Sequence, residues 1–511
     1  MPGWLKDTVF YEIYPQSFRD TNNDGIGDIN GIIQKLDYIH DLGCNALWIN
    51  PCYDSPFKDA GYDVRDYKKV APRYGSNTDL YRLFGEAHNR GMHVLLDLVP
   101  GHTSEEHPWF LESQKAEKNE FSDRYVWTNA AFQGIGGHPY ISGECPRDGS
   151  YMLNFFKCQP ALNYGFLNRT EDWQMAPDAP ACIATREALK DIMRFWMDHG
   201  CDGFRVDMAD SLVKEDDEHK SATCQIWRNI RQMMDQDYPD AALVSEWSNP
   251  QQSLKAGFHM DFYLDHHGNG YNTMVRDGET PGGDHSFFLK NGHGDIMRFL
   301  KDYLPKYNAT RKHGYISFLT CNHDTPRETK TLSIPELKLA YAFFFTMPGV
   351  PFLYYGDEIG MRYLDLPTKE GGYARTGTRT PMQWNHERNL GFSEAAADTL
   401  YLPVDPASDA PTVESCEKDP DSLLQTVKDI IKLRHCEEDL QADAIFEVLY
   451  AEKERFPFVF RRGNLVIAVN PSGQEQSAPV ATEKKPIFTI GSVNTEYGKL
   501  TLAPQSFAVL K

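Results

Sequence analysis

A chain of 511 residues is too long for one hydrophobic core, so we expect a large domain accompanied by one or two smaller ones. Its hydrophobic and charged fractions, 41% and 24%, are ordinary for a globular protein. The formal net charge of −21, without any block rich in lysine and arginine, argues against a nucleic-acid or anionic-membrane partner and favours a neutral or cationic substrate.

The N-terminal segment MPGWLKDTVF lacks the basic stretch and the apolar core of a signal peptide. No apolar run approaches the ~20 residues of a membrane span. The ten cysteines form no CxxC pair, and Cys44, Cys201 and Cys321 lie in or beside apolar runs, which favours buried free thiols over a disulfide framework. Together these features predict a cytoplasmic protein.

Short apolar runs recur along the chain and predict eight β-strands. They cover Val9–Tyr14, Ala46–Ile49, His93–Val99, Gly203–Met208, Ala242–Trp247, Phe258–Leu264, Tyr315–Cys321 and Pro351–Tyr355. Helical periodicity appears between them, for example at Ile29–Leu42, Asn77–Arg90, Thr185–Asp198 and Ile334–Phe345. Eight strands, most of them followed by a helix, predict a parallel (β/α)8 barrel of the TIM type. An open doubly wound sheet would fit six such runs as well, but eight match a closed barrel better.

Two segments depart from this alternation. Residues 103–173 are rich in Gly, Pro, Asn and aromatic residues and predict a loop-rich subdomain inserted after the third strand, since loops of that length are usually functional. Beyond about residue 441 the pattern becomes alternating, as in antiparallel β-structure. We therefore predict a barrel domain of residues 1–102 and 174–440, an insertion of residues 103–173 and a C-terminal β-sandwich of residues 441–511.

A turn rich in oxygen ligands follows the first predicted strand. In DTNNDGIGD these ligands are the side chains of Asp20, Asn22, Asp24 and Asp28 and the carbonyl of Ile26. The spacing matches the first nine positions of an EF-hand loop, but Gly31 stands at the twelfth, where the bidentate glutamate is expected. Oxygen ligands suit Ca²⁺ or Mg²⁺, and an Asp/Asn/Gly turn without a metal fits the pattern alone equally well.

Four segments carry an acid, or an acid with a basic partner, at the end of a strand-like run. They are DLVPGH (Asp97 to His102), GFRVD (Gly203 to Asp207), LVSEW (Leu243 to Trp247) and NHD (Asn322 to Asp324). A strand that ends in a carboxylate points this group toward the rim of a sheet or barrel, so the four segments can meet in one pocket. Such a pocket holds what glycoside cleavage needs: a nucleophile, a proton donor and charges that stabilise an oxocarbenium ion.

Each of these segments also has a simpler interpretation when it is taken alone. Arg205 and Asp207 are two residues apart, so they share one face of a strand, where they could form an ordinary structural ion pair. Glu246 could be an exposed glutamate at a strand end, and a lone histidine is usually structural. Only the combination of the segments favours an active site.

Further segments occur in a fixed order: FYEIYPQSFRD, GIGDINGI, GYDVRDY, QPALNY, GVPFLYYGDEIG and TRTPMQW. With the strand-end segments they resemble the α-amylase superfamily of glycoside hydrolases, essentially from end to end. The nearest branch is similar to the α-glucosidases, oligo-1,6-glucosidases and trehalose synthases. The resemblance implies a structural ion, Ca²⁺ or Mg²⁺, in the loop from Asp20 to Asp28, and nothing in the sequence requires an organic cofactor.

The resemblance also implies catalytic roles. Asp207 looks like the nucleophile that forms a covalent glucosyl-enzyme, and Arg205 would keep its carboxylate ionised and oriented. Glu246 would be the general acid, which needs a raised pKa. Asp324 would bind sugar hydroxyls and favour the distorted ring of the transition state. The reaction would retain the anomeric configuration, with the two working carboxyl groups ~5–5.5 Å apart.

Substrate contacts follow from the same resemblance. His102 and His323 would hydrogen-bond the sugar, while Asp97 would support Arg205. In KDAGYD, Asp59 would close the pocket around the terminal glucose and Tyr62 would stack under its ring. An arginine before TPMQW, here Arg379 with Arg375 as a close contender, would join Asp59 in sealing the pocket.

Three positions differ from the family pattern. Met208, directly after Asp207, matches neither residue type usual for α-1,4 or α-1,6 preference. Gly101 stands where the family commonly has Asn, which argues against a calcium site in that loop, and Ala161 replaces the usual Asp of QPALNY.

The sequence thus predicts a retaining, exo-acting α-glucosidase that acts on small α-linked gluco-oligosaccharides. A transglucosidase or isomerase of the trehalose synthase type, using the same intermediate, is the close alternative. A non-catalytic sugar-binding or transporter-associated member of the family is the alternative of another class. Linkage preference, physiological substrate and oligomeric state do not follow from the sequence.

Overall fold

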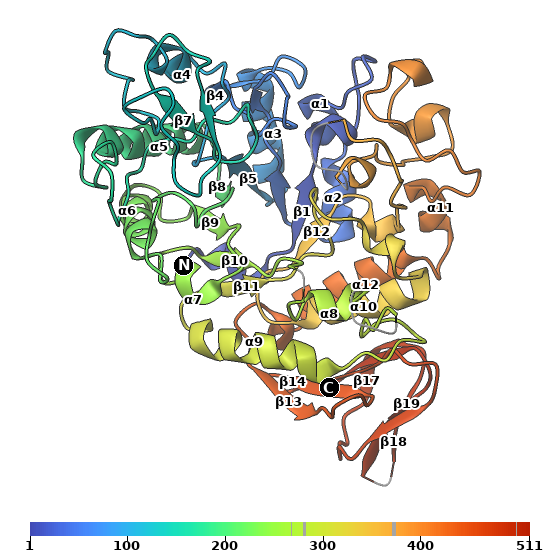
Figure 1. The fold of residues 1–511 in the computed structure, drawn as a ribbon. Coiled ribbons are helices and arrows are strands. Elements are labelled where there is room, and N and C mark those ends of the chain that lie inside the picture. The colour runs from blue at the N-terminus through green and yellow to red at the C-terminus, as the bar shows by residue number, and fades with distance from the viewer. Residues whose placement is uncertain (267, 279–282, 370–374, 497) are drawn as a thin grey trace.

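Eight parallel strands form a barrel in the computed structural model, which describes residues 1–266, 268–278, 283–369, 375–496 and 498–511 (Figure 1). In spatial order the sheet runs β11-β10-β9-β8-β5-β2-β1-β12. A parallel bridge between Leu319 and Phe352 brings its two outer strands together and closes the barrel. The strands are β1 (Phe10–Ile13), β2 (Ala46–Ile49), β5 (His93–Leu98), β8 (Gly203–Val206), β9 (Ala242–Ser245), β10 (Met260–Phe262), β11 (Tyr315–Ser317) and β12 (Phe352–Tyr354). The predicted barrel is confirmed.

The interior of the barrel changes from apolar to polar along the strand direction. Aromatic rings form the apolar level: Phe10 stacks on Phe352 with ring centroids 4.3 Å apart, and Trp48 packs on Phe262 at 5.2 Å. Because side chains alternate along a strand, the next inward-facing residues follow two positions later. These are polar and fully or almost fully buried: Glu12, Asn50, Asp97 and Arg205. The polar level faces the carboxyl ends of the strands.

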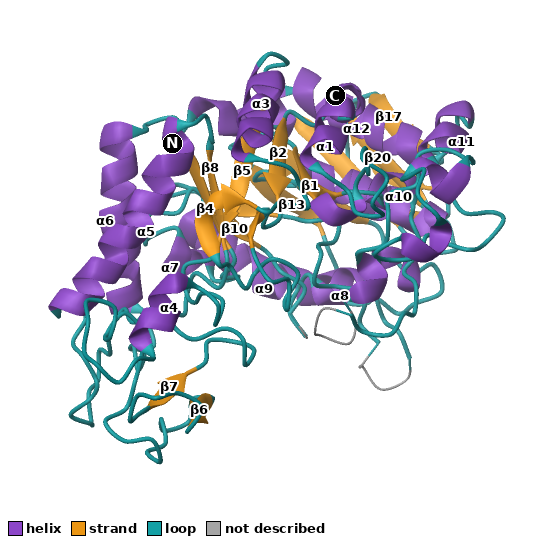
Figure 2. Ribbon diagram, turned by 90° about the horizontal axis from the view of Figure 1, so that it is seen from above, coloured by secondary structure: helices purple, strands orange, loops and turns teal. Residues whose placement is uncertain are grey.

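Helices surround the barrel (Figure 2). In α3, a capping box between Ser76 and Asp79 begins the helix, and buried Leu80, Leu83 and Ala87 form the stripe that packs on the barrel. The main helices are α1 (Ile29–Gln34), α2 (Leu36–Leu42), α3 (Asn77–His88), α5 (Pro180–Asp198), α6 (Ser221–Asp237), α9 (Ile296–Thr310), α10 (Ile334–Thr346) and α12 (Leu423–Cys436). Shorter helices are α7 (Pro250–Ser253), α8 (Asn272–Val275) and α11 (Val413–Lys418).

Two long excursions leave the barrel on the side of the carboxyl strand ends. After β2, the antiparallel pair β3 (Tyr53–Asp54) and β4 (Asp66–Val70) frames the loop that carries Asp59 and Tyr62. After β5, the chain forms α4 (Pro108–Ser113), β6 (Tyr140–Ser142) and β7 (Ser150–Met152) before α5 begins, and β6 and β7 project away from the barrel in Figure 2. This second excursion corresponds to the insertion predicted after the third strand.

The C-terminal part consists of antiparallel sheets, shown in red in Figure 1. One sheet has the order β13-β14-β15-β20-β17 and the other β16-β19-β18. Apolar residues of both sheets, including Val466, Ala468, Leu500 and Leu502, form one buried cluster between them. The strands are β13 (Phe446–Tyr450), β14 (Phe458–Arg462), β15 (Leu465–Asn470), β16 (Gln476–Ala478), β17 (Pro486–Ile490), β18 (Val493–Glu496), β19 (Lys499–Leu502) and β20 (Ser506–Leu510).

Two buried arginines tie the end of α10 to neighbouring elements. Arg434 of α12 donates to the carbonyl oxygens of Phe345 and Met347 at 2.8 and 3.2 Å, and Arg462 of β14 donates to that of Thr346. The last carbonyls of a helix have no partner within it, and the helix dipole favours cations there. The Arg462 contact therefore fastens the barrel to the C-terminal sheets, and the Arg434 contacts join α10 to α12.

Some element limits differ from the sequence prediction. The expected helix Ile29–Leu42 is divided into α1 and α2 at Lys35, whose dihedral angles (φ −109°, ψ 5°) leave the helical range. The Lys35 ammonium lies over the Trp384 ring, 4.0 Å from its centroid, which favours this local conformation. Strand β11 ends at Ser317 rather than Cys321, although Leu319 still forms a parallel bridge with Phe352.

All ten cysteines lie in the described part of the chain and each is free. Seven of them, including Cys44, Cys201 and Cys321, are buried as predicted, whereas Cys145 and Cys416 are half-buried and Cys436 is exposed. Within the described ranges, no helix combines the length and apolar character required to cross a bilayer.

The start of β8 allows no side chain. Gly203 has φ +135°, and a Cβ there would lie 1.9 Å from the carbonyl oxygen of Ala242 in β9. We expect Gly203→Ala to lower the free energy of unfolding by at least ~2 kcal/mol, through backbone strain and displacement of β9. Urea denaturation measures this change. The control is Gly85→Ala in α3, where a Cβ meets nothing within 4 Å and should stabilise the helix by ~0.5–1 kcal/mol. Equal effects of the two substitutions would contradict the packing described for β8.

Candidate active site

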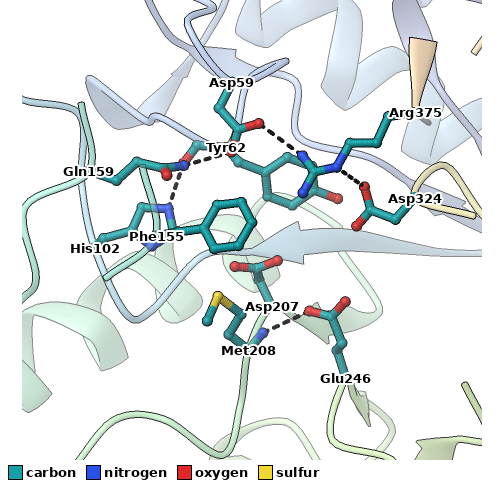
Figure 3. A pocket seen from close by; sticks show the side chains of 10 residues that line it. All are labelled: Asp59, Tyr62, His102, Phe155, Gln159, Asp207, Met208, Glu246, Asp324 and Arg375. Atoms are coloured by element: carbon teal, nitrogen blue, oxygen red, sulfur yellow. Dashed lines mark hydrogen bonds and ion pairs between the residues drawn. The ribbon is translucent and has the colours of Figure 1, made fainter. Parts of the chain in front are cut away.

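The carboxyl ends of the barrel strands surround a pocket with a cavity volume of about 170 Å³ (Figure 3). Its walls come from the barrel strand ends, from the loop after β2, from the insertion and from the segment after β12 that carries Arg375. The lining residues are Asp59, Tyr62, His102, Phe155, Gln159, Asp207, Met208, Glu246, Asp324 and Arg375. The structure thus brings together all three residues predicted to be catalytic and three of those predicted to bind the substrate.

The Arg205 guanidinium lies directly under the pocket and binds three carboxylates. Its Nη1 is 2.8 Å from Asp97 Oδ1 and 3.0 Å from Asp207 Oδ1, and its Nη2 is 2.8 Å from Glu246 Oε1. The Arg205 side chain is only 1% exposed. Asp207 and Glu246, which come from β8 and β9, therefore share one buried cation.

Asp207 and Glu246 also influence each other. Burial and the neighbouring Glu246 carboxylate raise the pKa of Asp207, while Arg205 opposes both effects. The backbone N–H of Met208 donates to Glu246 Oε2 at 2.9 Å, which links the two strand ends directly. Two close carboxylates repel each other, so Asp207 ionises less readily beside Glu246 than it would alone.

The arginine that joins Asp59 is Arg375, not Arg379 as predicted. Arg375 Nη1 is 3.1 Å from Asp59 Oδ1, and its Nε is 3.1 Å from Asp324 Oδ1, so one side chain bridges both acids across the pocket (Figure 3). Arg379 is fully buried behind it and binds Asp324 Oδ1 at 2.9 Å. Arg379 also donates to the carbonyl of His323 at 2.8 Å. Sequence position did not separate the two arginines, because both precede TPMQW by a few residues.

Burial and charge act differently on Asp59 and Asp324. Burial raises the pKa of Asp59 to about 6, although Arg375 and Arg379 oppose it. Burial also opposes ionisation of Asp324, yet the Arg375 and Arg379 guanidinium groups hold the pKa of Asp324 below its usual range. Asp324 therefore stays ionised at neutral pH, and Asp59 titrates closer to neutrality.

The two histidines are both buried and already hydrogen-bonded within the protein. His102 Nε2 lies 3.1 Å from the carbonyl of Tyr62, and its Nδ1 lies 3.0 Å from Asn154 Nδ2. His323 Nδ1 lies 2.8 Å from Glu12 Oε1, and its Nε2 lies 2.6 Å from the Tyr62 hydroxyl. Burial lowers the pKa of His102 to about 3 and that of His323 well below its usual value, so both rings are neutral. A sugar can hydrogen-bond to either ring only by replacing one of these partners.

Sequence reasoning did not single out two of the lining residues. Gln159 donates to Asp59 Oδ2 at 2.7 Å, and its place in QPALNY was a signal that could have found it. Phe155 lies in the insertion, 5.4 Å from the Arg375 guanidinium. It carried no signal, because a phenylalanine in a loop-rich segment has many structural uses.

The departure at Gly101 has a structural counterpart. A Cβ at Gly101 would lie 2.7 Å from Asn154 Nδ2, so the glycine makes room for the Asn154 side chain. Asn154 in turn accepts a hydrogen bond from Lys214 Nζ at 3.1 Å. The insertion is thereby attached to the chain that follows β8.

The loop proposed to hold a metal is closed by its own hydrogen bonds. Asp20 accepts the N–H groups of Asn22, Asn23 and Gly25 and the hydroxyl of Ser393, at 2.5 to 3.1 Å. A carboxylate offers about four lone-pair positions, so this arrangement leaves none on Asp20 for an ion. Asp28 is likewise engaged by Thr21 and Gly31, and Asp24 Oδ1 by the N–H of Ile26. Among the described residues, no group of three or more His, Cys, Asp or Glu side chains is gathered as metal ligands would be. As arranged, the loop does not fit an ion.

A barrel with paired carboxylates around a buried arginine at its carboxyl end defines the class, a glycoside-cleaving barrel enzyme. The chain belongs to the α-amylase family, because the family description "Alpha amylase, catalytic domain" matches residues 12–443.

Individual relatives support this membership, and a solved structure shows the same fold. The chain is 31% identical to the probable oligo-1,6-glucosidase 2 of Bacillus subtilis, a match that covers 93% of this chain and 91% of the relative. It is also 31% identical to the trehalose synthase/amylase TreS of Mycolicibacterium smegmatis, over 84% of this chain and 76% of the relative. A solved structure of an inactive double mutant of MutB with isomaltulose has the same fold, with a TM-score of 0.82 and 24% identity over all of both chains.

The hydrogen-bonded loop leads to a test of metal dependence. We expect treatment with EDTA to leave the melting temperature unchanged within ~1 °C, because the bonds of Asp20 and Asp28 close the loop without an ion. Differential scanning calorimetry with and without the chelator measures this. A lowered melting temperature that added Ca²⁺ restores would instead show that the ion implied by the family resemblance is bound.

Proposed function

We propose that the chain is a retaining, exo-acting α-glucosidase that releases terminal glucose from small α-linked gluco-oligosaccharides through a covalent glucosyl–Asp207 intermediate. The observation that carries this proposal is the Asp59–Arg375–Asp324 bridge, which lies across the pocket from Asp207 and Glu246 (Figure 3). A pocket closed on one side accepts the terminal unit of a sugar chain and leaves no room for a further sugar beyond that unit. The relatives named oligo-1,6-glucosidase support the same substrate class.

The residues around Arg205 account for the first half of the reaction. With Arg205 holding one oxygen, the other oxygen of Asp207 attacks the anomeric carbon of the terminal glucose. Glu246 gives its proton to the oxygen of the leaving sugar, so no free alkoxide forms.

The second half reverses the roles of the same groups. Glu246, now ionised, takes a proton from water, and this water attacks the anomeric carbon and releases Asp207. The Met208 N–H at 2.9 Å fixes the orientation of Glu246 for both proton transfers. Each displacement inverts the anomeric centre, so α-glucoside gives α-glucose.

The charge balance of the site favours a cationic transition state. Five carboxyl groups (Asp59, Asp97, Asp207, Glu246 and Asp324) stand against three guanidinium groups (Arg205, Arg375 and Arg379). An oxocarbenium ion forming among them gains from the excess of negative charge, whereas the neutral substrate gains little.

A transglucosidase or isomerase that uses the same intermediate is the second candidate. The relatives named trehalose synthase/amylase favour it, and the two reactions differ only in whether water or a sugar hydroxyl releases Asp207. Incubation with maltose separates them, since glucose alone indicates hydrolysis, trehalose indicates isomerisation and longer saccharides indicate transfer.

The covalent mechanism predicts two opposite chemical rescues. With p-nitrophenyl α-glucoside, Asp207→Ala should lose ~10⁴-fold or more in turnover, and azide should restore it by direct attack, which gives β-glucosyl azide. Glu246→Ala should still form the intermediate from this good leaving group, and azide should then give α-glucosyl azide. Proton NMR of the anomeric signal distinguishes the two products. The wild type should release glucose first as the α anomer; first release of the β anomer, or full activity of Asp207→Ala, would refute the assignment.

The bridge formed by Arg375 predicts a change in substrate length. Arg375→Ala leaves Asp59 and Asp324 without a shared cation, so kcat/KM for maltose should fall at least ~30-fold, equivalent to ~2 kcal/mol. The ratio of kcat/KM for maltotetraose to that for maltose should rise, because the closed side of the pocket opens. The control is Arg375→Lys, which keeps the charge but not the forked guanidinium that reaches both acids. Its kcat/KM and its maltotetraose-to-maltose ratio should lie between those of the wild type and those of Arg375→Ala. An unchanged ratio in Arg375→Ala would show that the bridge does not limit chain length.

A further inference from the structure

A buried acid lies beneath the pocket and takes no part in the chemistry described above. Glu12 is the second inward-facing residue of β1 and is 0% exposed. Its Oε1 is 2.8 Å from His323 Nδ1 and accepts a hydrogen bond from Asn50 Nδ2 at 3.2 Å. Its Oε2 is buried and has no hydrogen-bond partner among the described residues. A buried acid bound to one histidine raises the question of which group carries the proton.

From Glu12 a chain of short contacts leads to Arg205. His323 Nε2 lies 2.6 Å from the Tyr62 hydroxyl, this hydroxyl lies 3.0 Å from Asp97 Oδ2, and Asp97 Oδ1 lies 2.8 Å from Arg205 Nη1. The rings of His323 and Tyr62 are stacked, with centroids 5.4 Å apart and an interplanar angle of 10°. Every member is at most 5% exposed, so water does not substitute for a missing link.

Counting the protons shows which atom donates in each hydrogen bond between Glu12 and Arg205. Asp97, paired with Arg205, accepts hydrogen bonds, so the single hydroxyl proton of Tyr62 points to it. Tyr62 then accepts from His323 Nε2, which must carry hydrogen. Because burial keeps His323 neutral, its Nδ1 has no hydrogen and accepts hydrogen bonds. Asn50 Nδ2 lies 3.2 Å from this nitrogen, and Glu12 Oε1 lies closer, at 2.8 Å. A carboxylate oxygen that close to an unprotonated nitrogen would be repelled, so Glu12 is the uncharged acid and donates to it.

The surroundings of Glu12 agree with this assignment. Burial, together with the charges of Asp97 and Asp324, raises the pKa of Glu12 well above its usual value, and these effects exceed those of Asn50 and Arg205. Burying Oε2 without a hydrogen-bond partner costs less free energy when it is a neutral carbonyl oxygen than when it belongs to a carboxylate anion. In the opposite arrangement Tyr62 would donate to His323, and Glu12 would have to hold a buried negative charge.

We propose that Glu12 is a positioning residue for the glucoside-cleaving site: as an uncharged acid it donates to His323 Nδ1 and fixes the His323–Tyr62–Asp97 chain that holds Arg205. This inference rests on the proposed function only for its kinetic consequence. Asp97 in turn keeps Arg205 in contact with Asp207 and Glu246, so the effect of Glu12 reaches both working carboxyl groups.

Two substitutions separate the reach of the side chain from its charge. Glu12→Gln keeps the length and supplies an uncharged N–H donor, so kcat/KM should stay within about threefold of the wild type and its pH profile should be unchanged. Glu12→Asp keeps the acid but is one methylene shorter, so it cannot reach His323, and kcat should fall ~10²-fold with little change in KM. Equal losses in both variants, or a shifted pH profile in Glu12→Gln, would overturn the proposal, because the ionised form would then matter.

Glu358 offers matched controls on the outer side of the barrel. It is also fully buried, and its Oε1 accepts hydrogen bonds from Tyr11 at 2.7 Å and Tyr38 at 2.8 Å. Glu358→Gln and Glu358→Asp should lower the melting temperature, because they disturb a buried hydrogen-bonded acid, without changing kcat per folded molecule. A loss of kcat in Glu358→Asp equal to that in Glu12→Asp would reduce the role of Glu12 to general stability.

A structural measurement tests the proposal independently of activity. In crystal structures of the wild type and of Glu12→Asp, the His323 Nε2 to Tyr62 hydroxyl contact should be of hydrogen-bond length in the wild type and broken in the variant. An unmoved His323 ring in Glu12→Asp would refute the positioning role. If the wild type turns over no glucoside, the proposed function fails, while this comparison still decides the role of Glu12.

Discussion

The site depends on one buried guanidinium. Arg205 is almost inaccessible to water, and its burial is tolerated because Asp97, Asp207 and Glu246 surround it at hydrogen-bond distance. Removing one partner from such a cluster leaves an uncompensated charge, which costs ~3–5 kcal/mol. Since these acids come from β5, β8 and β9, the cluster is satisfied only when the three strands are in register. The barrel and the catalytic charges therefore stabilise each other.

The polar level of the barrel is connected from one side to the other. Below it, the aromatic level of Phe10, Trp48, Phe262 and Phe352 excludes water, so every polar contact above lies in a medium of low dielectric constant and is strengthened. Trp48 joins the two levels, because its ring packs in the apolar floor and its Nε1 donates to Asp97 at 3.0 Å. The same low dielectric constant explains why the neutral forms of the buried histidines are favoured.

Backbone strain occurs beside each of the two working carboxyl groups. Met208, directly after Asp207, has φ 41°, and Ser248, two residues after Glu246, has φ 56°. Neither residue is glycine, so each such conformation costs ~1–3 kcal/mol, which the surrounding structure must provide. At Met208 the strained conformation directs the backbone N–H to Glu246 Oε2, to which it donates a hydrogen bond. Asp261 holds the turn at Ser248, since its Oδ1 accepts hydrogen bonds from the Ser245 hydroxyl and the Ser248 N–H.

The sequence by itself determined the barrel and its chemical residues, because these rest on local patterns. Apolar runs of strand length predict strands, and the spacing of Arg205 and Asp207 places both side chains on one face. The tertiary structure decided which partners meet. In the tertiary structure Arg375, and not Arg379, is the partner of Asp59. Gln159 and Phe155 of the insertion form part of the pocket wall. Glu12 of the first strand contacts His323, which lies 311 residues later in the sequence. Such contacts join segments far apart in the chain, and local spacing carries no information about which of two nearby side chains will reach a distant one.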